Sequence, residues 1–133
     1  MNNNKNQSTG IFTPEALLEH WQGHRRITRR MIEAFPEDKL FTHSIGGMRP
    51  FADLVYEFLG MTVPGITGIA TGKWQQWADA EKVTTKKELL SLWDEATEKL
   101  NSIWPTIPPQ RFNETDKAFG QWEGVVYLSL IHI

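Results

Sequence analysis

The chain contains no cysteine among its 133 residues, and this absence removes several kinds of chemistry. Without a thiol there is no disulfide framework, no thiolate zinc site and no cysteine nucleophile. Neither sign of charge is in clear excess, because the chain has 14 basic and 16 acidic residues and a net charge of -2. Binding a nucleic-acid backbone calls for a strongly basic surface, so we expect no nucleic-acid partner.

We expect no membrane-spanning run, and the N-terminus lacks the apolar core of a signal peptide. Residues 1–11 are polar and predict a disordered tail. We therefore expect a cytoplasmic protein without a membrane partner. A hydrophobic content of 40% in a chain of this length supports one compact core, and the sequence predicts a single helical domain over residues 12–127.

Helix signals dominate what is present. The run Thr13-Pro14-Glu15 combines an N-cap residue, a proline in the first turn and an acid near the positive helix end, and it predicts a helix over residues 14–34. An apolar stripe at spacings of three and four, with its flanking residues, predicts one broad inward face: Leu17, Trp21, His24, Thr28, Met31 and Phe35, flanked by Leu18, Ile27 and Ile32. The basic cluster of this helix then falls on the opposite, solvated face, with an anion or RNA site as the less favoured alternative: Arg25, Arg26, Arg29 and Arg30.

A second helix is predicted from Pro50 to Ala70, kinked or interrupted around Pro64 and closed by Gly72. The capping-box sequence from Thr85 to Glu88 predicts a third helix, which Pro105 ends. Residues 122–127 predict the start of a fourth helix, and no strand of convincing length is visible. The predicted fold class is therefore all-α, an up-and-down-type four-helix bundle with a truncated fourth helix.

Three segments carry a resemblance to a known family: Phe12-Thr13-Pro14-Glu15, Gly47-Met48-Arg49-Pro50-Phe51-Ala52-Asp53-Leu54 and Phe119-Gly120-Gln121-Trp122-Glu123-Gly124. Together they resemble the DinB-like proteins. The resemblance implies a four-helix bundle that holds a divalent metal ion, such as zinc, nickel or iron. Its ligands would be one histidine of helix two and a His-x-x-x-His pair of helix four. A thiol-dependent, transferase-like activity is implied too, with a small-molecule thiol as partner.

The first departure from the family pattern is Glu57, which stands where the family has its helix-two histidine. A carboxylate can also ligate a metal ion, so Glu57 is the predicted metal ligand. This residue lies on or beside the apolar stripe, where an unpaired charge is costly and asks for a partner. Two alternatives stay open: a metal ion, or an arginine such as Arg49. No catalytic residue is predicted.

The second departure is the last six residues, Leu128-Ser129-Leu130-Ile131-His132-Ile133, which stand where the family's histidine pair would follow. The codons CTG TCT CTT ATA CAC ATC encode this hexapeptide and match the mosaic-end adapter of transposase-based sequencing libraries. We expect residues 128–133 to be a non-native tail in which His132 has no biological role; a natural short tail is the alternative. An incomplete bundle exposes apolar faces, so we expect aggregation or a homodimer, and little or no catalytic activity.

Two histidines and two tryptophans have both a functional and a structural explanation. His20 and His24 are four apart and could face one metal ion, but packing of His24 against Trp21 and Thr28 is favoured. Trp74 and Trp77 lie in a connector and are predicted at a pocket rim. The alternative to a metal-dependent function is a metal-free helical protein that binds or scaffolds without catalysis.

Overall fold

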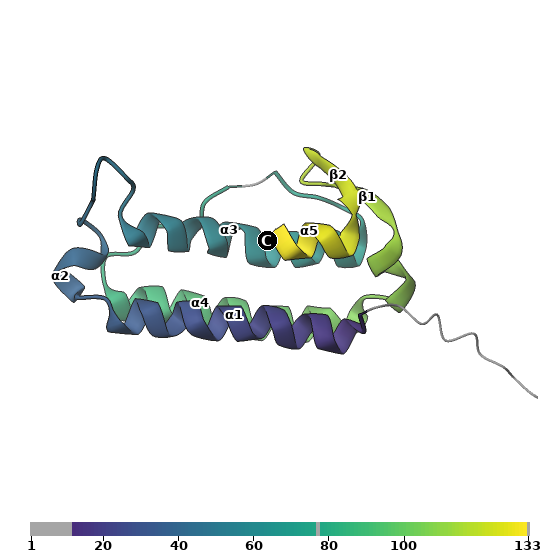
Figure 1. The fold of residues 1–133 in the computed structure, drawn as a ribbon, viewed down its shortest axis with the longest axis horizontal. Helices are drawn as coiled ribbons and strands as arrows, with labels where there is room; N and C mark the ends of the chain where they lie inside the picture. The colour runs from purple at the N-terminus through teal and green to yellow at the C-terminus, as the bar shows by residue number, and fades with distance from the viewer. Residues whose placement is uncertain (1–11, 77, 133) are drawn as a thin grey trace, which may run out of the picture.

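The computed structural model describes residues 12–76 and 78–132, and most of them are helical (Figure 1). The helices are α1 (Pro14–Ala34), α2 (Glu37–Leu40), α3 (Phe51–Thr71), α4 (Lys86–Ile103) and α5 (Val126–His132). Two 3-10 turns, η1 (Trp104–Thr106) and η2 (Pro109–Asn113), lead into an antiparallel hairpin of β1 (Thr115–Ala118) and β2 (Trp122–Val125). The largely helical class is confirmed, and the tail predicted at residues 1–11 lies outside the described residues.

The helix ends follow the chemistry of neighbouring residues. The hydroxyl of Thr13 accepts a hydrogen bond from the N–H of Ala16 at 3.1 Å, which caps α1. Thr85 and Glu88 form the reciprocal capping box at the start of α4. Gly72 follows α3 in the left-handed region, with φ of 72°, where a Cβ is disfavoured. These predicted boundaries are confirmed.

Helix α3 runs without a break from Phe51 to Thr71, so the alternative of an interruption at Pro64 is wrong, and the alternative of a kink stays a prediction. Proline lacks the N–H that would bond to the carbonyl of Gly60, and the helix is held instead by its surroundings. Gly60 lies directly against the connection to α4, where an added Cβ would stand 2.1 Å from the carbonyl oxygen of Ala78. Next to it, the N–H of Ala80 donates to the carbonyl of Tyr56 at 3.2 Å. Tertiary packing therefore outweighs the local preference of proline.

The three long helices do not follow a simple up-and-down order. At one end of the molecule Ile32 of α1 packs with Val55 of α3 and Leu89 of α4. At the other end, early α1 meets the late parts of α3 and α4. Helices α3 and α4 are therefore parallel to each other and antiparallel to α1, and the connection between them runs back along α3 (Figure 1).

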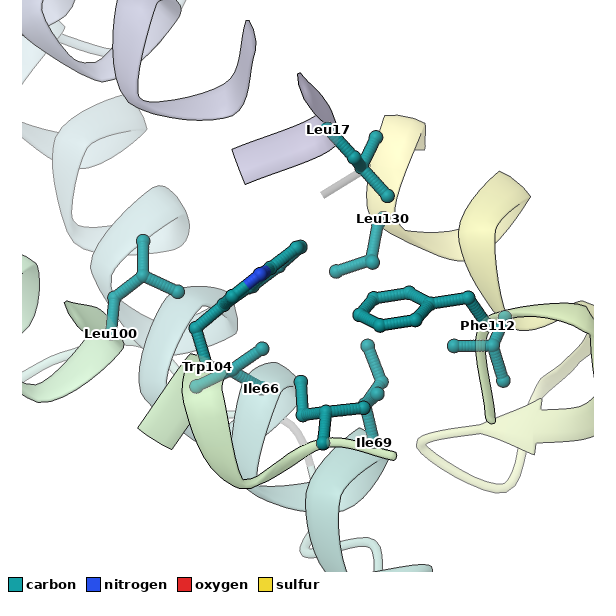
Figure 2. Close-up of a cluster of buried hydrophobic side chains, with 9 residues drawn as sticks. Leu17, Ile66, Ile69, Leu100, Trp104, Phe112 and Leu130 are labelled. Carbon is teal, nitrogen blue, oxygen red and sulfur yellow. The ribbon is translucent and has the colours of Figure 1, made fainter. Parts of the chain in front are cut away.

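At the end of the molecule where α1 begins, a hydrophobic core brings together side chains of α1, α3, α4 and α5, as Figure 2 shows. Its buried members are Leu17, Ile66, Ile69, Leu100, Trp104, Ile107, Phe112, Val126 and Leu130. Leu130, in the segment predicted as a non-native tail, is 4% exposed and packs within this cluster. Burial of a leucine side chain stabilises a fold by about 2 kcal/mol, so α5 contributes to this core.

Helix α3 is long and apolar enough to cross a membrane by length and composition alone, although the sequence suggested no such run. Half of its most apolar window is buried inside the protein. The buried core helix of a bundle passes the same test, so this property is a weak indication.

The segment that begins at Trp122 is a strand, so the fourth helix predicted there is wrong, and α5 starts only at Val126. Ala118 pairs with Trp122 and Thr115 with Val125. Phe119 and Gly120, with φ of 53° and 69°, form the tight turn that reverses the chain. Strands this short hold too few residues to reveal an alternating pattern.

The inward face of α1 also differs from the predicted stripe. Its buried residues are Leu17, Gln22, Arg25 and Ile32, whereas Met31 is 51% exposed. Gln22 donates to the side-chain oxygen of Asn101 on α4 at 2.8 Å, which makes its burial tolerable. Hydrophobic periodicity missed this face because it counts hydrogen-bonded polar residues as solvated.

Candidate functional site

A pocket of about 710 Å³ opens between α3, the hairpin and α5, and is called here the hairpin pocket. Most of its wall is apolar and aromatic. Its lining comprises Glu57, Met61, Ala118, Phe119, Trp122, Glu123, Gly124, Leu128, Ser129 and His132. A concave, mainly apolar surface with a few polar groups is the usual character of a small-molecule site.

Glu57 projects from α3 at the edge of the hairpin pocket, and its side chain is 27% exposed. Nη2 of Arg49 donates to a carboxylate oxygen of Glu57 at 2.6 Å. This hydrogen bond and the charge of Glu57 raise the pKa of Arg49 above its ordinary value. Glu57 is therefore paired with Arg49, which was the alternative to a metal ion, and its role as a metal ligand stays a prediction.

A divalent metal ion needs more ligands than Glu57 alone. Glu57, Glu123 and His132 all line the hairpin pocket. Within residues 12–76 and 78–132, however, no three histidine, cysteine, aspartate or glutamate side chains are grouped so that they could hold a metal ion. Protein metal sites of the predicted kind use at least three such ligands, so the residues described do not fit the implied ion.

Phe119 is the strained member of the pocket wall. Its φ of 53° is unusual for a residue with a bulky side chain and costs of order 1 kcal/mol. The Phe119 ring lies 5.3 Å from the ring of Trp74 and 6.1 Å from that of Trp122, between centroids, which holds the conformation. Sequence reasoning missed Phe119 and Trp122 because it assigned Trp122 to a helix.

Trp74 is not among the lining residues of the hairpin pocket, although its ring contacts Phe119 of the pocket wall. Its ring packs on Gly68, where an added Cβ would stand 2.3 Å from the ring. Its indole N–H donates to Asp116 at 3.0 Å. Trp74 therefore fixes the connection and the hairpin to α3, while Trp77 lies outside the described residues.

Arg111 ties the elements behind the hairpin pocket together. It donates to the backbone carbonyl of Ile69 at 2.9 Å, to Glu114 at 2.9 Å and to Asp116. Burial raises the pKa of Asp116, but the bonds from Arg111 and Trp74 outweigh it and leave that pKa below its ordinary value. Asp116 is therefore a carboxylate at neutral pH.

A second cleft, of about 330 Å³, lies between α1 and α3 beside the end of α5 and is called here the arginine cleft. Its lining comprises Leu17, His20, Trp21, His24, Arg25, Thr28, Phe58, Thr62, Trp93, Leu130 and Ile131. No aspartate or glutamate is among these lining residues. Its charged and titratable groups are thus one arginine and two histidines.

Arg25 is 5% exposed, so its predicted place on the solvated face is wrong. It donates to the hydroxyl of Thr62 at 3.0 Å and from Nη2 to Thr97 at 3.0 Å and the carbonyl of Trp93 at 3.2 Å. Burial lowers the pKa of Arg25 to about 10, and the nearby charge of Asp94 opposes this only in part. The side chain stays protonated at neutral pH.

The other arginines of α1 lie at the surface as predicted. Arg26 contacts Glu19 at 2.5 Å, and Arg29 contacts Asp94 at 2.6 Å. Exposed ion pairs of this kind contribute little to stability, about 0 to 1 kcal/mol. Arg25, in contrast, is buried and donates its hydrogen bonds to neutral groups of α3 and α4.

His20 and His24 stand at the arginine cleft with their ring centroids 4.7 Å apart, edge to face. Both are exposed, so the predicted inward position of His24 is wrong, while its packing against Trp21 and Thr28 stays a prediction. The two imidazoles lie close together as their spacing predicted, but no third ligand joins them among the described residues.

No protein-family model matches this chain, and no curated protein matches it either. The resemblance to DinB-like proteins therefore stays a prediction. The candidate functional sites are the hairpin pocket and the arginine cleft. The fold brings the residues of each together from distant parts of the sequence.

Proposed function

We propose that this protein is a helical-bundle binding protein that holds a small organic molecule in the hairpin pocket, without catalysis by its own residues. The observation that carries the proposal is the pocket itself. About 710 Å³ of largely apolar space is bordered by two carboxylates, Glu57 and Glu123, and by the half-exposed ring of Trp122.

The chemistry of the wall favours a ligand with an apolar body and an amino group. Trp122 and Phe119 offer aromatic faces, which attract cations by about 0.5 to 2 kcal/mol. Glu57 is already engaged by Arg49, so Glu123 is the carboxylate left to meet the ammonium group. A ligand of this kind would place its apolar part against Met61 and Leu128.

Calorimetric titration with phenylethylamine and with neutral phenylethanol tests this function. We expect the amine to bind more tightly than the alcohol, and Glu123→Gln to remove that difference. Trp122→Ala should weaken the amine by about fivefold or more, because the cation loses its aromatic face. Phe12→Ala removes an exposed aromatic side chain outside the pocket and should leave binding unchanged.

Two results would overturn the proposal. Absence of binding by the amine at millimolar concentration would show that the pocket is not a site for this class of ligand. Equal binding to the wild-type protein and Trp122→Ala would show that the amine binds elsewhere.

A second candidate function follows from the resemblance, namely a DinB-like four-helix bundle that binds a divalent metal ion through Glu57 and acts on a small-molecule thiol. What supports it is the resemblance together with the position of Glu57 at the edge of the hairpin pocket, whereas no complete set of metal ligands is found among the described residues. Metal content measured by mass spectrometry on protein purified without chelators tests it. Bound metal that is lost in Glu57→Ala and kept in Arg49→Ala would support this candidate, while metal-free protein would exclude Glu57 as a ligand.

The cytoplasmic location and the homodimer stay predictions.

A further inference from the structure

The arginine cleft contains a buried positive charge without a carboxylate on it. Every hydrogen-bond partner of Arg25 among the described residues is neutral: two threonine hydroxyls and the backbone carbonyl of Trp93. Its guanidinium carbon stands 4.2 Å from the centroid of the Trp93 ring. A guanidinium has five N–H donors, and Nε of Arg25 is buried without a hydrogen-bond partner in the described structure.

Such an arrangement is costly unless something supplies the missing negative charge. Removing a cation from water costs several kcal/mol, and neutral hydrogen-bond acceptors return only part of it. The residues that line the cleft include no acid. The charge of Asp94 acts on Arg25 without a hydrogen bond, and its carboxylate accepts hydrogen bonds from Arg29 instead, so it compensates the buried charge only in part. His20 and His24 also line the cleft, and neither can supply a negative charge, because imidazole is either neutral or positively charged.

The rest of the cleft is apolar. Trp21, Phe58 and Trp93 contribute aromatic rings from three different helices, and Leu17, Leu130 and Ile131 add aliphatic side chains. Its volume of about 330 Å³ lies at the lower end of the range for small-molecule sites. A free inorganic anion would leave these apolar surfaces uncovered, whereas an organic anion would cover them.

We propose that the arginine cleft is a second binding site, which takes a small organic carboxylate. Its carboxylate group accepts hydrogen bonds from Arg25, and its hydrocarbon or aromatic part packs against Trp21, Phe58 and Trp93. Charge-assisted hydrogen bonds between a guanidinium and a carboxylate are among the strongest in proteins, which gives the site its selectivity for acids. This site is separate from the hairpin pocket and does not depend on the function proposed there.

The test uses three acids of different shape, phenylacetate, octanoate and indole acetate, each compared with its neutral amide. Titration calorimetry on the wild-type protein should show that at least one acid binds about tenfold more tightly than its amide. In nuclear magnetic resonance spectra, the indole N–H signals of Trp21 and Trp93 should shift on binding, while that of Trp122 should not.

Variants of the cleft separate a binding role of Arg25 from a purely structural one. Arg25→Met keeps the length of the side chain and removes its charge, so the preference for acid over amide should disappear. Thr28→Leu keeps Arg25 and fills the cleft, and it should weaken the acid by about tenfold even if Arg25→Met fails to fold. Arg30→Met on the exposed face of α1 is the matched control and should bind as the wild type does.

Several outcomes would overturn the proposal. One is that none of the three acids binds at millimolar concentration; another is that acid and amide bind equally. Acid binding that survives in folded Arg25→Met, or that shifts only Trp122, would also exclude the cleft. Dimerisation that shifts the Trp21 and Trp93 signals without any response to acids would assign the cleft to a second copy of the chain instead.

Discussion

Two arginines lie inside this protein, and their partners are of opposite kinds. Arg111 contacts two carboxylates, Glu114 and Asp116, whereas Arg25 contacts only neutral groups within the described structure. Burial lowers the pKa of both guanidinium groups. At Arg111 the carboxylates outweigh burial and raise the pKa, while at Arg25 burial prevails and the pKa falls to about 10. The charge of Arg111 is balanced by carboxylates of the fold, whereas in our proposal the charge of Arg25 is balanced by a bound ligand.

The partners also depend on the two arginines to different extents. The hydroxyl of Thr62 donates to the carbonyl of Phe58 at 2.7 Å, and that of Thr97 donates to the carbonyl of Trp93 at 3.0 Å, so the acceptors of Arg25 have other hydrogen bonds. Asp116, in contrast, is a half-buried charge whose opposite charge comes from Arg111. Removing Arg111 should therefore damage the fold more than removing Arg25.

The largest effect is expected for Arg111→Met. The free energy of unfolding should fall by about 3 kcal/mol, because Asp116 keeps a charge without its ion-pair partner and the carbonyl of Ile69 loses a donor. Urea unfolding followed by circular dichroism measures this loss. Arg30→Met, at an exposed position, is the control and should change stability by no more than about 0.5 kcal/mol. If Arg111→Met lost no more free energy of unfolding than Arg30→Met, the contacts of Arg111 would not stabilise the fold.

Asp116→Asn should lower the free energy of unfolding by about 1 to 2 kcal/mol at neutral pH, because the amide keeps a hydrogen bond but loses the charge. The pKa of Asp116 in the folded protein lies below its ordinary value of 3.8. Its stabilising contribution is therefore complete above the pKa of the unfolded chain and is lost as the pH falls through the lower folded value.

Thermal unfolding between neutral pH and about pH 2 measures this contribution. The wild-type protein should lose stability below about pH 4, and Asp116→Asn should lose less over the same window. The difference between the two proteins should therefore shrink on acidification. A difference that stays constant with pH would mean that the charge of Asp116 does not stabilise the fold.

The smallest effect is expected for Arg25→Met, with a change of less than about 1 kcal/mol. Replacing a buried charged side chain by an apolar one of similar length is often neutral, because the desolvation cost disappears together with the hydrogen bonds. The same urea unfolding measures it. A loss as large as that of Arg111→Met would show that Arg25 is chiefly a structural tie between α1, α3 and α4.

Part of the fold was predictable because its signals are local. Thr13 begins α1, the box of Thr85 and Glu88 begins α4, and Gly72 ends α3, each through groups only a few residues apart. The hairpin was not predictable in this way. It depends on the left-handed turn at Phe119, which Trp74 supports from a distant part of the chain.

The candidate sites show the same limit. Glu57 was identified from the resemblance, because it stands at the family's histidine position, and its place beside an apolar stripe indicated a partner such as Arg49. Arg25 was assigned to solvent because a pattern of apolar residues carries no information about which polar residues will find buried partners. Its acceptors, Thr62 and Thr97, lie 37 and 72 residues away in the chain.

The sequence by itself determined where the three long helices begin and end, because capping groups and turn residues act on their immediate neighbours. Tertiary structure alone decided which face of α1 is buried, how α3 continues through Pro64 and which charges lie in the two clefts. The physical reason is that burial of a polar or strained residue is stable only when distant groups supply its hydrogen bonds and packing, and those groups meet only in the folded chain.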